Sequence, residues 1–281
     1  MKLTIVTINY NNAEGLRKTL NSVAVQTYRD FEHIIIDGGS TDGSVDVIKE
    51  YDNTIKQSVT IDKSTIQVKW ISEKDNGIYD AMNKGIKLAT GDYCQFLNSG
   101  DYLASHDVTE RMVDALSNGI DVLYGNMKKV MPDGKFVRDV CGATNDVTLN
   151  MFYRGCLNHS PAYIKRSLFD EYGLYDETLK ICSDWKFYMQ SIVLGKAEVK
   201  YVNIDVTIFD MTGISETRKD ILNDERNRLL HEMVPEGILK DYDRYHFPME
   251  QYDRLKRHHL WELVWVIERI LFKLEKWRIL K

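Results

Sequence analysis

The chain has 281 residues, enough for one large domain or two small ones with a real hydrophobic core. Hydrophobic residues make up 43% of it and charged residues 28%, which excludes a disordered chain, a collagen and a membrane-embedded helix bundle. The net charge of −5 argues against nucleic acid as a partner, because dedicated nucleic-acid binders present a basic surface.

The first hundred residues alternate between strand and helix patterns. Short apolar runs end in polar loops, and the first three loops lead into apolar residues at helical spacing. The predicted strands cover residues 3–8, 31–36, 66–71 and 93–97. This repeat is typical of a parallel sheet with helices on its faces. Because ligands bind outside the carboxyl ends of such strands, we expect the four polar loops to surround one crevice.

The chain is less regular from residue 102 onward. Its predicted elements are an antiparallel hairpin of residues 120–131 and 135–140, strands at 159–164 and 199–209, and a helix at 183–194. From residue 216 the pattern is helical and charged, with interruptions expected at Gly237 and Pro248. We therefore predict an α/β fold with one mixed sheet. The domain that contains this sheet covers 1–215, in halves 1–101 and 102–215, and a C-terminal helical extension covers 216–281.

The loop after the second strand, D-G-G-S-T-D-G at 37–43, opens a helix, where unpaired backbone N–H groups favour anions. It is neither a G-x-G-x-x-G motif nor a P-loop. Asp37, at the tip of a buried strand, is well placed to accept hydrogen bonds from a ribose or a base edge. Turn chemistry with a Ser, Thr or Asp helix cap explains the same residues equally well.

The third loop and its helix hold E-K-D-N-G-I-Y-D-A-M-N-K-G at 73–85. Asp80 and Lys84 are four residues apart and share a helix face, which is consistent with an ordinary ion pair. The same helix can also point Asn83 and Lys84 back toward the strand ends, where they would meet a phosphate. The segment is therefore either a structural ion pair or part of a phosphate site.

The fourth strand ends in N-S-G-D at 98–101. A hard cation such as Mg²⁺ binds through one or two protein carboxylates together with substrate phosphates, so a single Asp101 is sufficient to hold it. An aspartate in an ordinary turn would give the same sequence.

These motifs occur in the order T-I-N-Y-N-N, I-I-I-D-G-G-S-T-D-G-S, E-K-D-N-G-I-Y-D-A-M-N-K-G and G-D-Y-x-x-F-L-N-S-G-D. In this order, over about the first 105 residues, the chain resembles the family 2 glycosyltransferases of the GT-A fold. The last two segments are most similar to the branch that makes bacterial surface polysaccharides of the colanic acid or capsule type. The resemblance implies a Rossmann-like mixed sheet and sugar transfer from a nucleotide-sugar donor, expected to be a UDP sugar, with a divalent cofactor, Mn²⁺ or Mg²⁺.

The resemblance also implies roles for individual residues. The nucleoside pocket would lie at the ends of the first two strands, with Asp75 near the base. Residues 98–101 replace the family's usual D-x-D motif, and because Asn98 stands at its first acidic position, Asp101 remains as the metal ligand. The side chains expected on the donor side are Asn9, Asp37, Asp75, Asn83, Lys84 and Ser99.

The expected catalytic base is Asp184. Ser183 and Asp184 begin a predicted amphipathic helix, so the carboxylate could be only a favourable charge at a helix N-terminus. Similar chains have an E-D or S-D pair before Trp here, which implies that Asp184 removes the acceptor proton in an inverting displacement. His159 is suggested by position to lie on the acceptor side, with a structural histidine as the alternative. Residues 212–215 resemble the family's G-G-[IV]-S loop, with Thr212 in place of the first glycine.

The sequence motifs support other functions less well. A nucleotidyltransferase should have a Gly-rich, basic loop after its first strand, and residues 9–12 contain neither feature. A retaining glycosidase needs two carboxylates that flank the bond, and the register of strand-end motifs argues against it. A non-catalytic subunit that binds a sugar nucleotide or a polysaccharide remains open. No G-x-S-x-G or H-E-x-x-H motif is present.

The cysteines and the chain start bear on the compartment. The four cysteines are far apart with no C-x-x-C pair, so we expect buried thiols and no zinc ribbon. The apolar run at 3–8 is too short for a secretory signal. The sequence contains no run of 18 apolar residues, the length needed to span a membrane as a helix. We therefore expect a cytoplasmic protein. The cysteines are Cys94, Cys141, Cys156 and Cys182.

Residues 251–281 differ from the rest of the chain. They carry a net charge of +4, which leaves −9 on residues 1–250, and they hold three of the five tryptophans. Their apolar residues recur at spacings of three and four between basic ones, as in a helix at the surface of an anionic membrane. We expect this tail either to dock the enzyme on the inner face of the cell membrane, near a lipid-linked acceptor, or to pack on the catalytic domain or another subunit.

Overall fold

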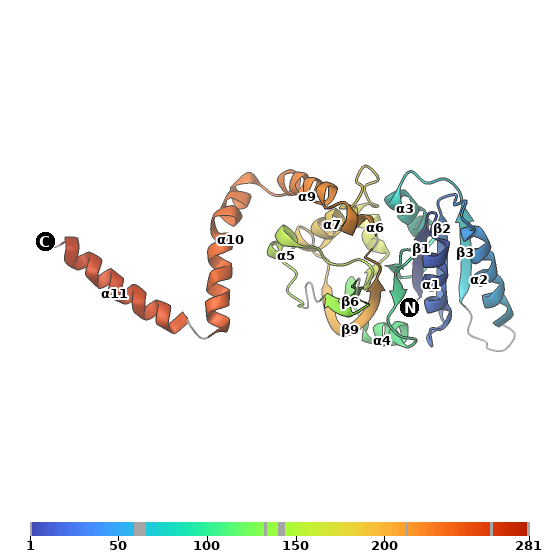
Figure 1. Cartoon of the computed structure of the whole chain (residues 1–281), viewed down its shortest axis with the longest axis horizontal. Helices are drawn as coiled ribbons and strands as arrows, with labels where there is room; N and C mark the ends of the chain where they lie inside the picture. The colour runs from blue at the N-terminus through green and yellow to red at the C-terminus, as the bar shows by residue number, and fades with distance from the viewer. Residues whose placement is uncertain are drawn as a thin grey trace. The chain divides into compact units, whose positions relative to one another are not determined.

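The computed structural model describes residues 2–58, 66–131, 134–139, 144–211, 213–258 and 261–279. The chain forms two compact units, Met1–Arg226 and Asn227–Lys281. The first contains one continuous mixed sheet with helices beside it, and the second is helical (Figure 1). This is the mixed α/β fold that the sequence predicts.

The N-terminal half is a parallel sheet, as predicted, in the order β3-β2-β1-β4. Its strands are β1 (Leu3–Asn9), β2 (Phe31–Asp37), β3 (Gln67–Ser72) and β4 (Tyr93–Phe96). The helices between them are α1 (Ala13–Ala24), α2 (Ser44–Ser58) and α3 (Ile78–Leu88). Every residue of β1 and β2 is buried, as expected for central strands covered on both faces. The register pairs Asn9 with Asp37 and Asp37 with Ser72, so these residues end neighbouring strands at one edge.

The second half extends this sheet with antiparallel pairs. Strand β8 (Ala162–Lys165) pairs with both β4 and β6 (Val122–Val130) and joins the two halves. The predicted hairpin is confirmed, because β6 pairs with β7 (Phe136–Asp139); its turn residues Pro132 and Asp133 lie outside the described residues. Strand β9 (Val199–Phe209) runs parallel to β6 and antiparallel to β5 (Tyr102–Leu103). Phe209 therefore ends its strand beside the loop that contains Asp101.

Short helices complete the second half. They are α4 (Val108–Ala115), α5 (Leu149–Arg154), α6 (Ser167–Tyr172) and α7 (Ser183–Tyr188), the last continuing as a π-helix (Met189–Val193). The predicted helix at 183–194 is thus confirmed. Its anchor is Trp185, which is 1% exposed and whose indole N–H donates to the carbonyl oxygens of Phe152 and Gly155. This contact fixes the position of the neighbouring Asp184. Of the cysteines, Cys94 and Cys182 are buried thiols and Cys156 is half-buried; Cys141 lies outside the described residues.

The C-terminal helices are α8 (Ile214–Thr217), α9 (Lys219–Met233), α10 (Glu236–Arg257) and α11 (Trp261–Ile279). The expected interruptions at Gly237 and Pro248 were wrong, because both residues lie inside α10. The break comes instead at Pro235, whose extended backbone caps α10 and whose ring cannot continue the preceding helix. No helix within the described ranges is long and apolar enough to cross a membrane.

The fold depends on a buried carboxylate in β2. Glu32 is fully buried, and its carboxylate accepts hydrogen bonds from Thr4, Lys69, Gly91 and both the backbone and hydroxyl of Thr90. Burial alone would raise its pKa, but these hydrogen bonds outweigh it and lower the pKa to about 2. Because the folded pKa is below that of the unfolded chain, ionised Glu32 stabilises the fold above about pH 4.5, and this stabilisation is lost as the pH falls toward 2.

We expect Glu32→Gln to destabilise the protein at neutral pH by on the order of 3 kcal/mol. Urea unfolding of both proteins at about pH 7 and about pH 3 measures the effect, and the gap should shrink by more than half at the lower pH. Glu50→Gln on exposed α2 is the control, because it removes a carboxylate of the same kind from the surface. A gap that does not depend on pH would contradict the role given to the ionised carboxylate.

Candidate active site

A cavity of about 790 Å³ opens at the carboxyl ends of the parallel strands. Residues of the polar loops after β1, β2, β3 and β4 line it, together with Phe209, Asp210, Gly213 and Ser215. The side chains and backbone that face it belong to Ile8, Asn9, Tyr10, Asn12, Gly38, Gly39, Lys74, Asp75, Gly77, Ile78, Ala81, Asn98, Ser99, Asp101, His159, Phe209, Asp210, Gly213 and Ser215. The four loops thus surround one crevice, as the sequence predicts. Thr212 lies outside the described residues.

Asp37 organises this cavity without lining it. Its carboxylate is fully buried and accepts hydrogen bonds from the Asn9 amide, the Ser40 hydroxyl and backbone N–H, and the Ser72 hydroxyl. Burial would raise its pKa, but these donors lower it. All four acceptor positions of the carboxylate are used within the protein. The same contacts orient Asn9, whose Oδ1 is buried, finds no hydrogen-bond partner among the described residues, and lines the cavity.

The loop before α3 brings Asp75 to the cavity and ties it to Lys84. The Lys84 ammonium lies 2.5 Å from the Asp75 carboxylate, 3.0 Å from that of Glu73 and 3.6 Å from that of Asp80. Burial would lower the pKa of Lys84, but these carboxylates raise it; the pKa of Asp75 is raised, because burial outweighs the opposing effect of Lys84. Lys84 therefore holds the loop that carries Asp75, and it is not among the residues that line the cavity.

Asn83 lies away from the cavity. Its side chain is 1% exposed, donates to the Tyr175 carbonyl oxygen and the Glu177 carboxylate, and accepts from the Tyr175 N–H. The amide therefore joins α3 to residues 175–177. Asp80 also has a structural role, because its carboxylate accepts the backbone N–H of Asn76 at 2.8 Å and stabilises the start of the helix.

Asp101 lines the cavity and has one carboxylate oxygen with no hydrogen-bond partner among the described residues. Its Oδ1 accepts the backbone N–H of Asp210, whereas Oδ2 is buried and finds no partner within the described ranges. Burial raises the pKa of this carboxyl to about 7. Asp210 lines the same cavity next to Gly100, whose φ of +106° favours glycine and where a Cβ would lie 3.1 Å from the Asp210 carboxylate.

The oxygen atoms of Asp101 and its neighbours fit a divalent cation that also binds the substrate. Asn98 Oδ1 is also buried without a partner in the described part of the chain, and it lines the same cavity. The described residues contain no group of three or more His, Cys, Asp or Glu side chains that could hold a metal ion alone. At phosphoryl sites Mg²⁺ commonly binds one or two protein carboxylate oxygens and takes its remaining ligands from phosphates and water.

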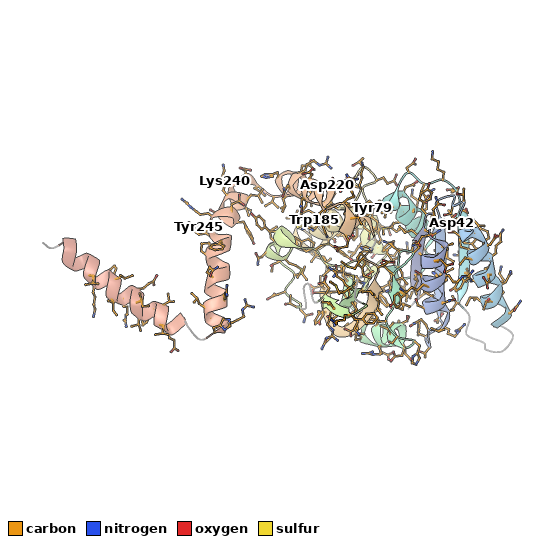
Figure 2. The ribbon with its side chains drawn as sticks, viewed as in Figure 1. Asp42, Tyr79, Trp185, Asp220, Lys240 and Tyr245 are labelled. Atoms are coloured by element: carbon orange, nitrogen blue, oxygen red, sulfur yellow. The ribbon has the colours of Figure 1, made fainter. Side chains whose placement is uncertain are left out.

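A second cavity of about 210 Å³ adjoins the first. The residues that line both are Ile78, Asn98, His159, Phe209 and Ser215. Asp184 lines only the second. Its Oδ1 accepts the Trp185 N–H at 2.8 Å and the Tyr79 hydroxyl at 3.2 Å, and its Oδ2 lies 3.0 Å from His159 Nδ1. Tyr79 and Trp185 are labelled in Figure 2.

His159 lies between the two carboxylates that the sequence singled out. Nδ1 contacts Asp184, whereas Nε2 is buried without a partner in the described structure. Burial would lower the pKa of the imidazole, but the hydrogen bond and charge of Asp184, with the charge of Asp101, raise it. His159 therefore connects the cavity that contains Asp101 to the cavity that contains Asp184.

Two residues of this site are not among those predicted from the sequence. Asp210 directly follows β9, the same position that drew attention to Asp37, so the pattern could have identified it. Glu225 in α9 accepts the backbone N–H groups of Lys180, Ile181 and Cys182 at 2.7, 3.0 and 3.0 Å. Its only sequence signal is an acidic residue in a charged helix. Glu225 fixes the loop from which α7, and hence Asp184, begins.

We expect Glu225→Gln to lower kcat by about 10- to 100-fold, because a small displacement of a catalytic group is costly. The substitution leaves one acceptor oxygen, which can keep the N–H groups of Ile181 and Cys182, and places an NH₂ group against the N–H of Lys180. Steady-state kinetics against the neighbouring exposed variant Asp224→Asn measure the effect. Donor binding should be retained, and an equal loss of donor binding would show that the whole fold, and not Asp184, was disturbed.

Comparison with known proteins agrees with this geometry. Residues 4–169 match the model of glycosyl transferase family 2, so the chain belongs to this family. A PGL/p-HBAD biosynthesis glycosyltransferase of Mycobacterium bovis BCG is 29% identical over 220 residues, which cover 77% of this chain and 80% of the relative.

Solved structures support the GT-A fold. TarS 1–349 of S. aureus in complex with UDP superimposes with a TM-score of 0.63 at 20% identity, over 91% of this chain and 74% of that one. The chain spans 44% of the longer TarS chain. The mannosyltransferase PcManGT of Pyrobaculum calidifontis, in complex with GDP-Man and Mn²⁺, gives a TM-score of 0.55 at 16% identity, over 74% of this chain and 56% of that one.

Proposed function

We propose that the protein is an inverting glycosyltransferase that moves a sugar from a nucleotide-sugar donor, a UDP sugar, to a hydroxyl group of a glycan or lipid-linked acceptor in surface-polysaccharide biosynthesis. The observation that carries this proposal is the pair of adjoining cavities. The first presents the unused oxygen of Asp101, and the second presents Asp184, with His159 between them.

The nucleotide end of the donor would occupy the larger cavity. Asn9 offers an unused amide oxygen and Asp75 a carboxylate to the ribose and base, while Asp37 keeps Asn9 in place. Tyr10 is 68% exposed beside the same cavity, where its ring can stack on the base. The TarS complex with UDP supports this assignment by analogy of fold. Ser99 lines the cavity near Asp101 and would face the phosphates.

A divalent metal would bind at Asp101 Oδ2, with Asn98 Oδ1 close to the same cavity. Such an ion stabilises the negative charge that develops on the leaving nucleoside diphosphate. The protein contributes the buried, unpaired oxygen. PcManGT, in complex with Mn²⁺, supports this role by analogy of fold.

Asp184 would act as the general base. The acceptor hydroxyl oxygen attacks the anomeric carbon, its proton passes to the Asp184 carboxylate, and the bond from that carbon to the phosphate oxygen breaks. In this proposal Asp184, which lines the cavity beside the donor cavity, takes up the proton on the side of the anomeric carbon opposite the nucleotide, so that the attack inverts the anomeric configuration. General base assistance is worth about 10² to 10⁴ in rate. His159, on the acceptor side, and Tyr79 hold the carboxylate in one orientation.

The alternatives account for less of this arrangement. A sugar-nucleotide-binding subunit has no need of a second cavity with an oriented carboxylate. A nucleotidyltransferase needs basic side chains in the loop after β1, and residues 9–12 are Asn, Tyr, Asn and Asn.

A thermal-shift screen of nucleotide sugars with and without Mn²⁺ tests the donor assignment, because a donor that binds the native state stabilises it by mass action. We expect UDP sugars with Mn²⁺ to raise the Tm most. GDP and CDP sugars are the matched comparison. A chain that no nucleotide sugar stabilises would contradict the proposal.

We further propose that α11 brings the enzyme to the inner face of the cell membrane, near a lipid-linked acceptor. Eight of its apolar side chains are each at least half exposed, and basic residues flank them. These side chains are Leu263, Trp265, Val266, Ile267, Ile270, Leu271, Phe272 and Leu274.

We expect the full chain to float with vesicles of phosphatidylcholine and phosphatidylglycerol and to bind less to pure phosphatidylcholine. Ile267→Glu combined with Ile270→Glu should abolish flotation, whereas Glu268→Gln should not. Light scattering tests the alternative that α11 binds a second copy of the chain. If the wild-type chain is a dimer that the double variant dissociates, and the double variant still floats, α11 binds a second copy.

A further inference from the structure

The charged side chains that line the smaller cavity are mainly basic. Lys129, Lys180, Lys219 and Arg226 face it, against the carboxylates of Asp184 and Glu216. The larger cavity has the opposite balance, with one basic residue, Lys74, against three aspartates. The contrast is notable in a chain whose net charge is −5. A cavity that must hold a neutral hydroxyl beside a catalytic carboxylate does not by itself require four cations.

The two carboxylates of this cavity are already engaged. Glu216 pairs with Lys219 at 2.8 Å and with Lys129 at 3.8 Å, and Asp139, outside the lining, also pairs with Lys129 at 2.9 Å. Asp184 is held by His159. The Lys180 ammonium, on an exposed side chain, has no carboxylate within ion-pair distance among the described residues.

The position of Lys180 is fixed by its backbone. Its N–H is one of the three that donate to the Glu225 carboxylate, and Lys180 lies four residues before Asp184. The ammonium is therefore carried by the same anchored loop as the proposed base. An anion bound by Lys180 would therefore lie near the hydroxyl that attacks the anomeric carbon.

We propose that the acceptor carries an anionic group, a phosphate or a carboxylate, close to the hydroxyl that receives the sugar, and that Lys180 with Lys219 recognises it. This proposal rests on the proposed function and specifies its substrate class. The carboxylate of Asp184 repels a negatively charged acceptor. Lysine side chains close to the acceptor's anionic group offset this repulsion. The anion has two possible sources, the phosphate of a lipid headgroup or the carboxylate of a uronic acid.

The test compares three acceptors that share an undecyl chain and carry the same sugar or the uronic acid derived from it. One is linked through a diphosphate, one is the neutral undecyl glycoside and one is the undecyl glycoside of the matching uronic acid. With the donor found by thermal shift, we expect kcat/KM for one anionic acceptor to exceed that for the neutral one by about tenfold or more, because charge-assisted contacts are strong. The preferred anionic acceptor identifies the source of the charge.

Variants show whether Lys180 causes the preference. Lys180→Gln should lower the ratio of kcat/KM for anionic over neutral acceptor by about tenfold, and Lys180→Glu should reverse it. Lys56→Gln, on exposed α2, should leave the ratio unchanged. Equal rates for all three acceptors with wild-type protein would overturn this inference alone. A wild-type protein that neither transfers nor hydrolyses any donor would overturn the proposed function, and this inference with it.

Discussion

Asp184→Asn is expected to reduce sugar transfer by about 10² to 10⁴ while donor binding is retained. The asparagine keeps the shape of the side chain and an oxygen that can accept the Trp185 N–H, but it cannot take up a proton. Transfer kinetics and donor-induced shifts in Tm, measured on the same preparations, separate the two effects. Asp46→Asn, an equal substitution at an exposed position of α2, is the control.

Unchanged turnover in Asp184→Asn would refute the assignment of the base. A loss of donor binding would also contradict it, because Asp184 lines only the smaller cavity. The result bears on His159 as well. If Asp184 is the base, His159→Gln should lower kcat without removing it, since the imidazole only orients the carboxylate.

Asp101→Asn is expected to have opposite effects on function and on stability. Removing the one carboxylate oxygen offered to the metal should reduce metal-dependent donor turnover by about 10² or more, because the ion supplies several kcal/mol of charge stabilisation. The amide retains the oxygen that accepts the Asp210 N–H, so the local fold should persist. The donor with Mn²⁺ should no longer raise the Tm.

The stability effect follows from the sign of the pKa shift. Burial raises the pKa of Asp101 to about 7 from an ordinary value of 3.8, so ionisation opposes folding increasingly as the pH rises between these values. Without metal, Asp101→Asn should therefore melt at a higher temperature than wild type at about pH 8, and the difference should shrink toward about pH 4. A variant less stable than wild type at about pH 8 would contradict the account of Asp101.

The parallel half of the fold follows directly from sequence patterns. Four apolar runs with polar loops predict four strands, and the alignment of their ends is a property of any parallel sheet. For that reason the sequence alone predicts that Asn9, Asp75, Ser99 and Asp101 lie around one cavity, and the fold confirms it.

The finer arrangement depends on long-range contacts that spacing does not encode. A helical pattern gives the face on which Asn83 lies, but its partners at 175–177 are 92 and 94 residues away. The position of Asp37 at a strand end was predictable. That Asn9, Ser40 and Ser72 occupy the hydrogen-bond acceptor positions of its carboxylate was not. The contact of His159 with Asp184 likewise requires the antiparallel pairing of β8, and the hydrophobic periodicity of the sequence does not predict this pairing.

The central claim is that this chain transfers a sugar with inversion from a nucleotide-sugar donor. Its most direct test is a ¹H NMR time course of slow donor hydrolysis, in which water replaces the acceptor and the sugar released first is recorded before its anomers equilibrate. The account predicts that the free sugar first appears with the anomeric configuration opposite to that of the donor, only when a divalent metal is present, and not in Asp184→Asn. Release with retained configuration, or no release from any nucleotide sugar, would contradict it.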